Sequence, residues 1–362
     1  MSDRVESVYV RNMLDANVWV LLALVVAGCT VEDHGGGAVV PFEEVLVPGE
    51  SVHLATAADD PLGEAADVVG WNGRLAVVDR LGKNVKVFTF DGELVMTIGR
   101  LGDGPGEFRE PISLAVDDRG QLAVLDLLHA RVTYFSPAGE RTSSFAFQGA
   151  FTGGMEALDR GRALLIGTRL LTDQGEAATP YMLHVFDHHG NVLMSLGQQP
   201  EPRARAEGPF MGVKVGLVDD SVAVWGIAGR RSLFFRPVDE GGRGTASADS
   251  IALGGLPEPD FDSAPQELDP LFDWAVQHPL LMEITGDRGV ALVRFIGGDA
   301  RKGEQWYQYA VVSLADRKTV AVTERTSHFV QRMSNGIATG VTVEDDGEAY
   351  LRRYRVLAIK GN

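Results

Sequence analysis

Two aspartates occupy equivalent places in the chain. Asp79 ends the stretch GRLAVVD, and Asp126 ends the stretch GQLAVLD 47 residues later. Paired carboxylates can perform general acid–base catalysis. An aspartate at the end of a strand can also accept N–H bonds from the backbone of its own turn. Because both aspartates recur within the same apolar pattern, we predict the structural role and assign no catalytic residue.

The histidines and the single cysteine show no spacing typical of a metal site. His188 and His189 are adjacent in the segment FDHHGN, where neighbouring side chains of an extended chain point apart. The sequence contains no His-x-His or His-Glu-x-x-His. One cysteine, Cys29, excludes an intramolecular disulfide and a Cys-based zinc cluster. We therefore predict no metal and no cofactor.

The glycine-rich segment LGDGPGEFREP, residues 101–111, raises the question of phosphate binding. A phosphate-binding P-loop needs Gly-Lys-Ser/Thr followed by a helix, whereas Glu107 and Phe108 follow here. Asp103 and Glu107 are too few ligands for a calcium loop. We predict a hinge between two sheets, with glycines in the turns and Phe108 filling the groove between the sheets.

Cys29 is the candidate for lipid attachment. The ten apolar residues Val18–Ala27 would span about 15 Å as a helix, against a hydrocarbon core of about 30 Å. They fit the apolar region of a signal peptide, and Val26-Ala27-Gly28-Cys29 resembles the bacterial lipobox. The alternatives are an ordinary signal peptide with a chance cysteine, or a buried strand.

The lipobox interpretation divides the N-terminal region into two parts. Residues 1–28 are predicted to be a lipoprotein signal peptide, and residues 29–40 a flexible tether. The protein would be exported to the bacterial cell envelope and anchored by lipid on Cys29, in the outer membrane or in a membrane facing the periplasm. Thr30, rather than Asp, after the cysteine favours the outer membrane by resemblance to enterobacterial sorting.

The net charge of −17 limits the possible partners. An acidic chain without a basic stripe repels nucleic-acid phosphates and anionic lipid headgroups. We therefore expect no nucleic-acid binding, a monomer, and membrane contact only through the lipid.

The residues from position 41 onwards repeat. Residues 73–92 and 120–139 superimpose without a gap, and their apolar residues mostly alternate with others, as in strands. Turn-plus-strand signatures occur near Gly73, Gly120, Gly161, Ser221, Gly289 and Gly347. Repeats of about 40–50 residues are typical of β-propeller blades. The sequence therefore predicts an all-β fold, a six-bladed β-propeller of four-stranded antiparallel blades over residues 41–362. The last blade lacks an outer strand, and we predict that a stretch within Phe42–Thr56 supplies it and closes the ring.

The segment GRLGDGPGEFREPISLAVDDRGQLAVLDLLHARVTYFSPAGE, residues 99–140, resembles the NHL-repeat family and its relatives, the six-bladed propeller lipoproteins of bacteria. The resemblance is strong over Asp67–Phe147 and faint elsewhere. It implies a scaffold rather than one activity. Members of such families include an amidating lyase with axial histidines around zinc, and lactonases with channel calcium held by first-strand residues. No matching set of residues is found here.

We therefore predict an envelope propeller that binds a protein, small-molecule or glycan ligand on one face. The alternative is a metal-dependent hydrolase, lactonase or lyase with its site in the central channel. Arg109, assigned to the channel, is the candidate ligand-binding residue. The acidic, proline-rich insertion at residues 254–280 is a candidate lid, a docking element, or a helix that caps the flank of the ring.

Overall fold

The computed structural model describes residues 37–150, 153–158, 161–219, 221–238, 248–299 and 302–357. The predicted signal peptide, Cys29 and the first residues of the predicted tether lie outside these ranges.

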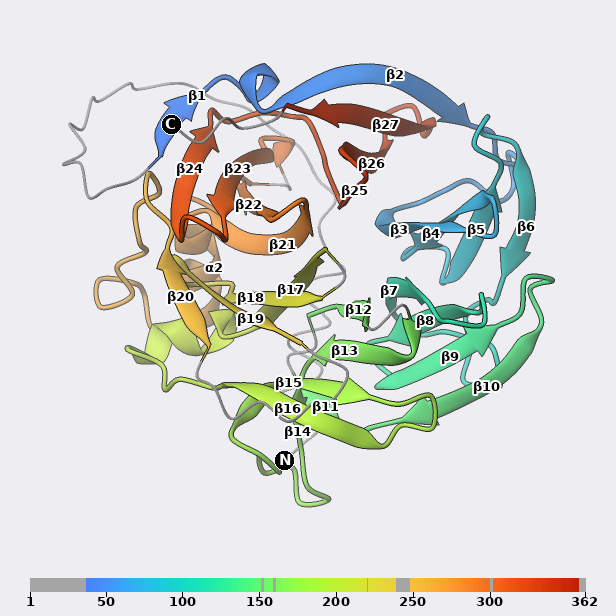
Figure 1. Ribbon diagram of the computed structural model, residues 1–362, viewed down its shortest axis with the longest axis horizontal. Helices are drawn as coiled ribbons and strands as arrows, with labels where there is room; N and C mark the ends of the chain where they lie inside the picture. Colours follow the sequence, from blue (N-terminus) through green and yellow to red (C-terminus); the bar gives the residue numbers. More distant parts are fainter. Residues whose placement is uncertain are drawn as a thin grey trace.

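Six four-stranded antiparallel blades surround a central axis, which confirms the predicted fold (Figure 1). The first strand of each blade is the innermost, and the fourth lies at the rim. Blade 1 comprises β3 (Ala65–Trp71), β4 (Arg74–Asp79), β5 (Asn84–Phe88) and β6 (Leu94–Ile98); blade 2 comprises β7 (Pro111–Val116), β8 (Leu122–Asp126), β9 (Arg131–Phe135) and β10 (Arg141–Ala146); blade 3 comprises β12 (Met155–Leu158), β13 (Ala163–Gly167), β15 (Tyr181–Phe186) and β16 (Val192–Gln198).

The second half of the ring follows the same order. Blade 4 comprises β17 (Val213–Val218), β18 (Val222–Ile227), β19 (Ser232–Pro237) and β20 (Asp249–Ala252); blade 5 comprises β21 (Leu280–Asp287), β22 (Val290–Gly297), β23 (Trp306–Ser313) and β24 (Lys318–Thr323); blade 6 comprises β25 (Arg332–Ser334), β26 (Ile337–Val343), β27 (Ala349–Val356) and β2 (Leu46–Leu54). A short pair, β11 (Gly149–Ala150) with β14 (Arg169–Leu170), lies beside blade 3.

The hydrophobic core is divided among the interfaces between blades. Each of six buried apolar clusters combines residues of two neighbouring blades. Phe108, fully buried between blades 1 and 2, lies 5.9 Å from Phe135 ring to ring, as predicted for a residue that fills the groove. A blade thus buries its two apolar faces only when it has a neighbour on each side.

The N-terminal strand β2 completes blade 6, as predicted. It pairs antiparallel with β27 from Leu46 opposite Val356 to Leu54 opposite Ala349. Leu54 also packs in the cluster shared by blades 6 and 1, together with Leu62 and Leu75. Both ends of the propeller chain are therefore held in one sheet.

Two expectations need correction. Residues 29–40 do not form a tether as far as residue 40, because Ala38–Val40 form β1, which pairs in parallel with β24 at the outer edge of blade 5. Gly347 is not equivalent to the other five signature positions: it lies between the second and third strands of blade 6, whereas Gly336 follows the first. Short glycine turns occur on both faces of the ring. In the last blade the sequence pattern was therefore matched to the turn after the second strand instead of the turn after the first.

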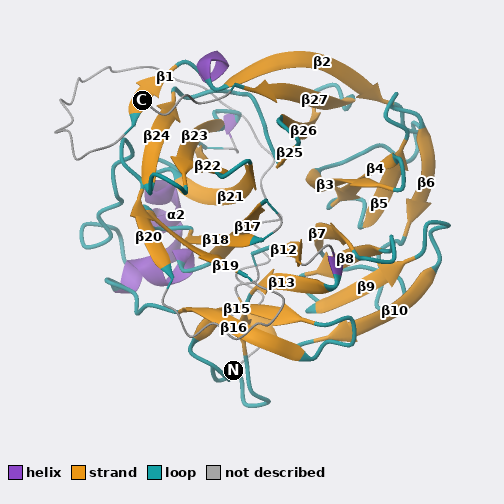
Figure 2. Ribbon diagram, in the orientation of Figure 1, coloured by secondary structure: helices purple, strands orange, loops and turns teal. Residues whose placement is uncertain are grey.

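Alternating strand direction defines two faces. Turns between first and second strands, and between third and fourth strands, lie on what we call the lower face. Turns between second and third strands lie on the upper face, together with the connections from one blade to the next. The few helices include η1 (Phe42–Glu44), η3 (Arg205–Phe210) and α2 (Leu268–Ala275) (Figure 2).

The insertion at residues 254–280 connects blade 4 to blade 5. Its helix α2 buries Leu271 and Ala275 in a cluster with Phe210 of η3, and Phe261 of the insertion packs against Phe210 at a ring distance of 5.6 Å. The insertion thus has a small apolar core of its own, shared with the preceding connection between blades.

Truncating Leu54 tests the closure of the ring. Leu54→Ala removes a side chain that is 1% exposed, so the free energy of unfolding should fall by about 2–5 kcal/mol. Val39→Ala in β1, where the side chain is 58% exposed, should change it by less than about 0.5 kcal/mol. Urea denaturation measures both, and equal effects would contradict the closing role of β2.

Candidate functional site

Each first strand brings one polar side chain to the axis of the ring. We call this set the axial ring; its members are Asp67, Ser113, Glu156, Lys214, Glu283 and Arg332. Four of these strands are otherwise apolar, whereas β21 also contains Thr285 and Asp287 and β25 also contains Ser334. The members lie in the half of each strand nearer the upper face, except Glu283 at mid-strand. The six innermost strands surround the centre of the molecule in Figure 1.

Arg332 joins four blades across the axis. Its guanidinium donates Nε to Asp67 Oδ1 at 2.9 Å and Nη2 to Asp67 Oδ2 at 2.7 Å. The same group donates to both carboxylate oxygens of Glu156 at 2.5 Å and to the Leu114 carbonyl at 3.0 Å. Asp67 Oδ2 also accepts bonds from the Ser113 hydroxyl at 2.9 Å. Charge-assisted, bidentate bonds of this kind are the strong ones in proteins.

Lys214 is a second cation of the axial ring. Its ammonium makes no hydrogen bond or ion pair with the residues that the structure describes. Burial lowers the pKa of Lys214, and the nearby negative charge of Glu283 only partly offsets this. Glu283 itself forms an ion pair with Arg294, whose Nη2 lies 3.5 Å from Glu283 Oε2. The axis therefore holds one ammonium without a direct counter-charge.

Burial also shifts the carboxyl groups of the ring. It raises the pKa of Glu156 to about 7, although Arg332 favours the ionised form. It raises the pKa of Glu283 in the same direction. Lys214, Glu156, Glu283 and Arg332 of the ring thus have perturbed proton affinity, a property that is concentrated at functional sites.

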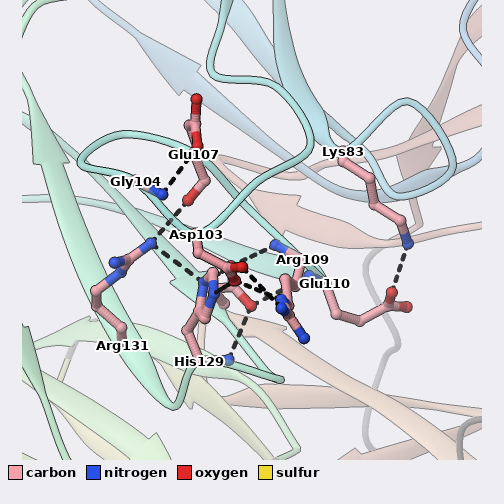
Figure 3. Close-up of polar contacts among 9 residues, drawn as sticks. Lys83, Asp103, Gly104, Glu107, Arg109, Glu110, His129 and Arg131 are labelled. Atoms are coloured by element: carbon pink, nitrogen blue, oxygen red, sulfur yellow. Dashed lines mark hydrogen bonds and ion pairs between the residues drawn. The ribbon is translucent and has the colours of Figure 1, made fainter.

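Arg109 is not a first-strand residue, and its side chain lies beside Asp103 and His129 (Figure 3). It follows the glycine-rich loop on the upper face, and its guanidinium pairs with Asp103 through Nε and Nη2. His129 contacts the same carboxylate through Nε2 at 2.8 Å. Bonds from Arg109 and His129 hold the pKa of Asp103 well below its usual range. The placement of Arg109 in the channel is therefore wrong, while its role in ligand binding remains a prediction.

The glycine-rich loop is built as a corner, as predicted. Glu107 Oε2 accepts a hydrogen bond from the backbone N–H of Gly104 at 2.8 Å (Figure 3). A carboxylate of the chain itself therefore binds the N–H group that a phosphate would use. Gly99, at φ +79°, leaves room for the Phe108 ring, which lies 2.3 Å from where a Cβ would stand. Within the loop, Gly102 and Gly106 have φ of +156° and +82°, and a Cβ on Gly102 would overlap the Glu107 carboxylate, so the turns themselves require glycine at these two positions.

Asp79 and Asp126 have the predicted structural role, and a wider one. Asp126 accepts N–H bonds from Arg109 at 2.8 Å and Glu110 at 3.1 Å, as well as from His129 of its own turn at 3.2 Å. Asp79 binds Gly63 and its own turn in the same way. Each aspartate thus fixes the connection that enters its blade.

The axial ring escaped the sequence analysis because its members are single polar residues in separate strands. Asp67 and Arg332 are 265 residues apart. The available signal was one charged or hydroxyl residue within nearly every apolar first strand, such as Lys214 in VKVGLV.

Comparisons with known proteins agree with this fold. Residues 38–151 match a family model, DUF5128, described as a 6-bladed beta-propeller. A solved structure from Bacteroides fragilis, of a protein described as exported, is similar with a TM-score of 0.63 at 14% identity, covering 89% of this chain and 98% of that one. A member of the DUF4221 family from Bacteroides vulgatus gives 0.60 at 11% identity, covering 86% and 98%. No curated protein sequence matches the chain.

These likenesses support the six-bladed propeller, the coarser part of the resemblance noted in the sequence. Membership of the NHL-repeat family and of the lipoprotein group remains a prediction.

The protonation of Glu156 predicts a pH dependence. With a pKa of about 7 in the folded chain against 4.5 for an unperturbed group, the folded state holds a proton that the unfolded state has released. The free energy of unfolding should therefore fall as the pH rises from about 4.5 to about 7.

Glu156→Gln removes this titration and should flatten the dependence by an amount on the order of 2 kcal/mol between about pH 5 and pH 7.5. Urea denaturation at both pH values measures it, with the exposed Glu140→Gln as a control that keeps the wild-type slope. Parallel curves for wild type and Glu156→Gln would show that Glu156 is ionised across this range.

Proposed function

We propose that the protein is an exported, lipid-anchored propeller that binds a ligand or a protein partner at the bacterial envelope, with the axial ring as the place of recognition. The observation that carries this proposal is Lys214: a partly buried ammonium in the axis, without a counter-charge in direct contact among the described residues.

The energetics favour a binding role for these groups. Taking charges out of water costs several kcal/mol for each ion, and apolar residues of similar volume often stabilise a fold as well or better. A ring of Val or Leu side chains would pack the axis at lower cost. Arg332 is compensated by Asp67 and Glu156, whereas Lys214 has no such partner in the part of the chain that the structure describes. A ligand that presents a carboxylate or another anionic group would supply it.

Attachment at the envelope is supported by sequence and comparison together. Cys29 follows an apolar segment too short to span a bilayer. A structural relative is described as exported. Among the described residues, no helix has the length and apolar character needed to cross a membrane. Two or more acyl chains on Cys29 would hold the protein at the bilayer.

A metal-dependent hydrolase, lactonase or lyase in the channel is the second candidate. The carboxylates of Asp67, Glu156 and Glu283 favour it, since oxygen ligands suit a hard cation. Arg332 makes short bonds to the first two, whereas the contact of Glu283 with Arg294 is longer, at 3.5 Å, so Glu283 is the carboxylate best placed to meet a substrate or cation. Calcium-dependent lactone hydrolysis lost in Glu283→Gln would establish this alternative in place of binding.

Exchanging Lys214 tests the binding site. The wild-type protein, Lys214→Met and the exposed Lys318→Met are incubated with an envelope extract, washed, and compared by native mass spectrometry and gel electrophoresis. We expect a bound species with the wild type and Lys318→Met, reduced at least tenfold in Lys214→Met, because Met keeps the length of the stem and removes the charge. Equal capture by all three would contradict the proposal.

Exchanging Cys29 tests the anchor. Cys29→Ser should abolish labelling with a radioactive fatty acid and move the protein from the membrane pellet to the soluble fraction, since the acyl chains provide the predicted membrane contact. Retention of the unlabelled variant in the pellet would show that another feature holds the protein there.

A further inference from the structure

We propose that Asp117, Asp118 and His188 form a binding site for a divalent transition-metal ion such as Zn²⁺, on the lower face between blades 2 and 3. We call it the interblade site. Asp117 and Asp118 lie in the turn between β7 and β8, and His188 lies in the turn between β15 and β16. One ligand atom from each residue can be chosen so that all three lie within 4.8 Å of one another.

Among the residues that the structure describes, three buried atoms at this site have no hydrogen-bond partner. They are Asp117 Oδ2 and both ring nitrogens of His188. The Asp117 side chain is fully buried, at 0% exposure, and the His188 side chain is 16% exposed. A buried polar atom that lacks a partner destabilises the fold, and more so when it is charged. One of the two His188 nitrogens, together with Asp117 Oδ2, is therefore available to bind an ion.

In the neighbouring turn, both carboxylate oxygens of the equivalent aspartate, Asp187, accept hydrogen bonds from the protein. Asp187 Oδ1 accepts two backbone N–H bonds, from His189 and Asn191, and its Oδ2 accepts the Asn191 side-chain amide at 2.8 Å. Asp117 Oδ1 accepts the corresponding pair, from Arg119 at 2.9 Å and Gln121 at 2.7 Å. Its Oδ2 instead faces His188 without a bond.

His188 lies within ion-pair distance of both aspartates, but neither contact is a hydrogen bond. His188 Nδ1 lies 3.9 Å from Asp117 Oδ2, and His188 Nε2 lies 3.4 Å from Asp118 Oδ1. The first distance is too long for a hydrogen bond, and the second is longer than the usual 2.7–3.2 Å. Two ligands at about 2.1 Å from a tetrahedral ion are themselves about 3.4 Å apart. The spacing of His188 Nε2 and Asp118 Oδ1 matches that value.

The donor set selects the class of ion. One imidazole nitrogen and two carboxylate oxygens suit Zn²⁺ or a similar transition metal, whereas Ca²⁺ takes six to eight oxygen ligands. Three protein ligands leave a fourth position for water. Tyr134, whose buried hydroxyl also has no partner and whose ring packs edge-on against His188 at 5.6 Å, adds a polar atom beside the site.

The site has a clear structural consequence. Its ligands come from two blades, so the ion would join blade 2 to blade 3 on the lower face. The chain already approaches closely there: a Cβ on Gly161 of blade 3 would stand 2.4 Å from the Asp117 backbone. Asp118, 36% exposed, gives the ion a route from solvent.

The experiment uses the mature chain without a histidine tag, stripped with EDTA and desalted. Calorimetric titration with ZnCl₂ should show one ion per chain, and the melting temperature should rise with Zn²⁺ concentration. His188→Ala should weaken the affinity at least tenfold and abolish the rise in melting temperature. The adjacent, exposed His189→Ala is the matched control and should bind Zn²⁺ as the wild type does.

Several outcomes would overturn the proposal. These are the absence of saturable Zn²⁺ binding to the wild type, unchanged binding in His188→Ala, or tight binding of CaCl₂ in place of ZnCl₂. If His188→Ala does not fold, the exposed Asp118→Asn decides the question by the same loss of affinity. Lys214→Met should bind Zn²⁺ normally, so this result is independent of the proposed function of the axial ring.

Discussion

The pairing of β2 with β27 is the interaction on which the rest of this structure depends. A propeller blade has two apolar faces, and a row of six blades would leave one face exposed at each end. Adding the N-terminal strand Leu46–Leu54 to the C-terminal blade joins the ends of the row. It also makes the first and last blades neighbours, so that Leu54 packs beside Leu75 and Val341. Every interface between blades is then buried.

Closure is also what creates the axial ring. Only in a closed circle do six first strands face one axis, and only then can Arg332 of the last blade reach Asp67 of the first and Glu156 of the third. The charges are costly to bury, and their mutual compensation is incomplete at Lys214. Stability and the proposed recognition are thus divided in this fold: the apolar interfaces stabilise the ring, and the axis and the turns hold the charged groups for which we propose binding.

The sequence allows the fold to be predicted because the repeat is a local signal. Alternating apolar residues and turn glycines recur within each blade, so the six blades and the closing strand follow from pattern alone, and the role of Asp126 follows from its position at the end of a strand. Gly347 was misplaced because similar turns occur at both ends of a blade. Parallel pairing of β1 with β24 has no local signal, since its partner lies about 280 residues away.

The candidate sites could not be predicted in the same way. Lys214 is one charge in an apolar strand, and its meaning depends on residues of other blades. His188 stands beside His189, and sequence alone does not show which of the two is buried against Asp117. These placements require the three-dimensional arrangement of turns and strands that the closed ring brings together.

Hydrogen exchange of the β2 amides that bond to β27 is the most direct test of ring closure. If β2 is an integral part of the ring, these amides exchange with the same opening free energy as those of the innermost strands, because both open only when the whole ring unfolds. Exchange of β2 at a much lower free energy, with the inner strands still protected, would show that the six blades hold together without it and would contradict the account.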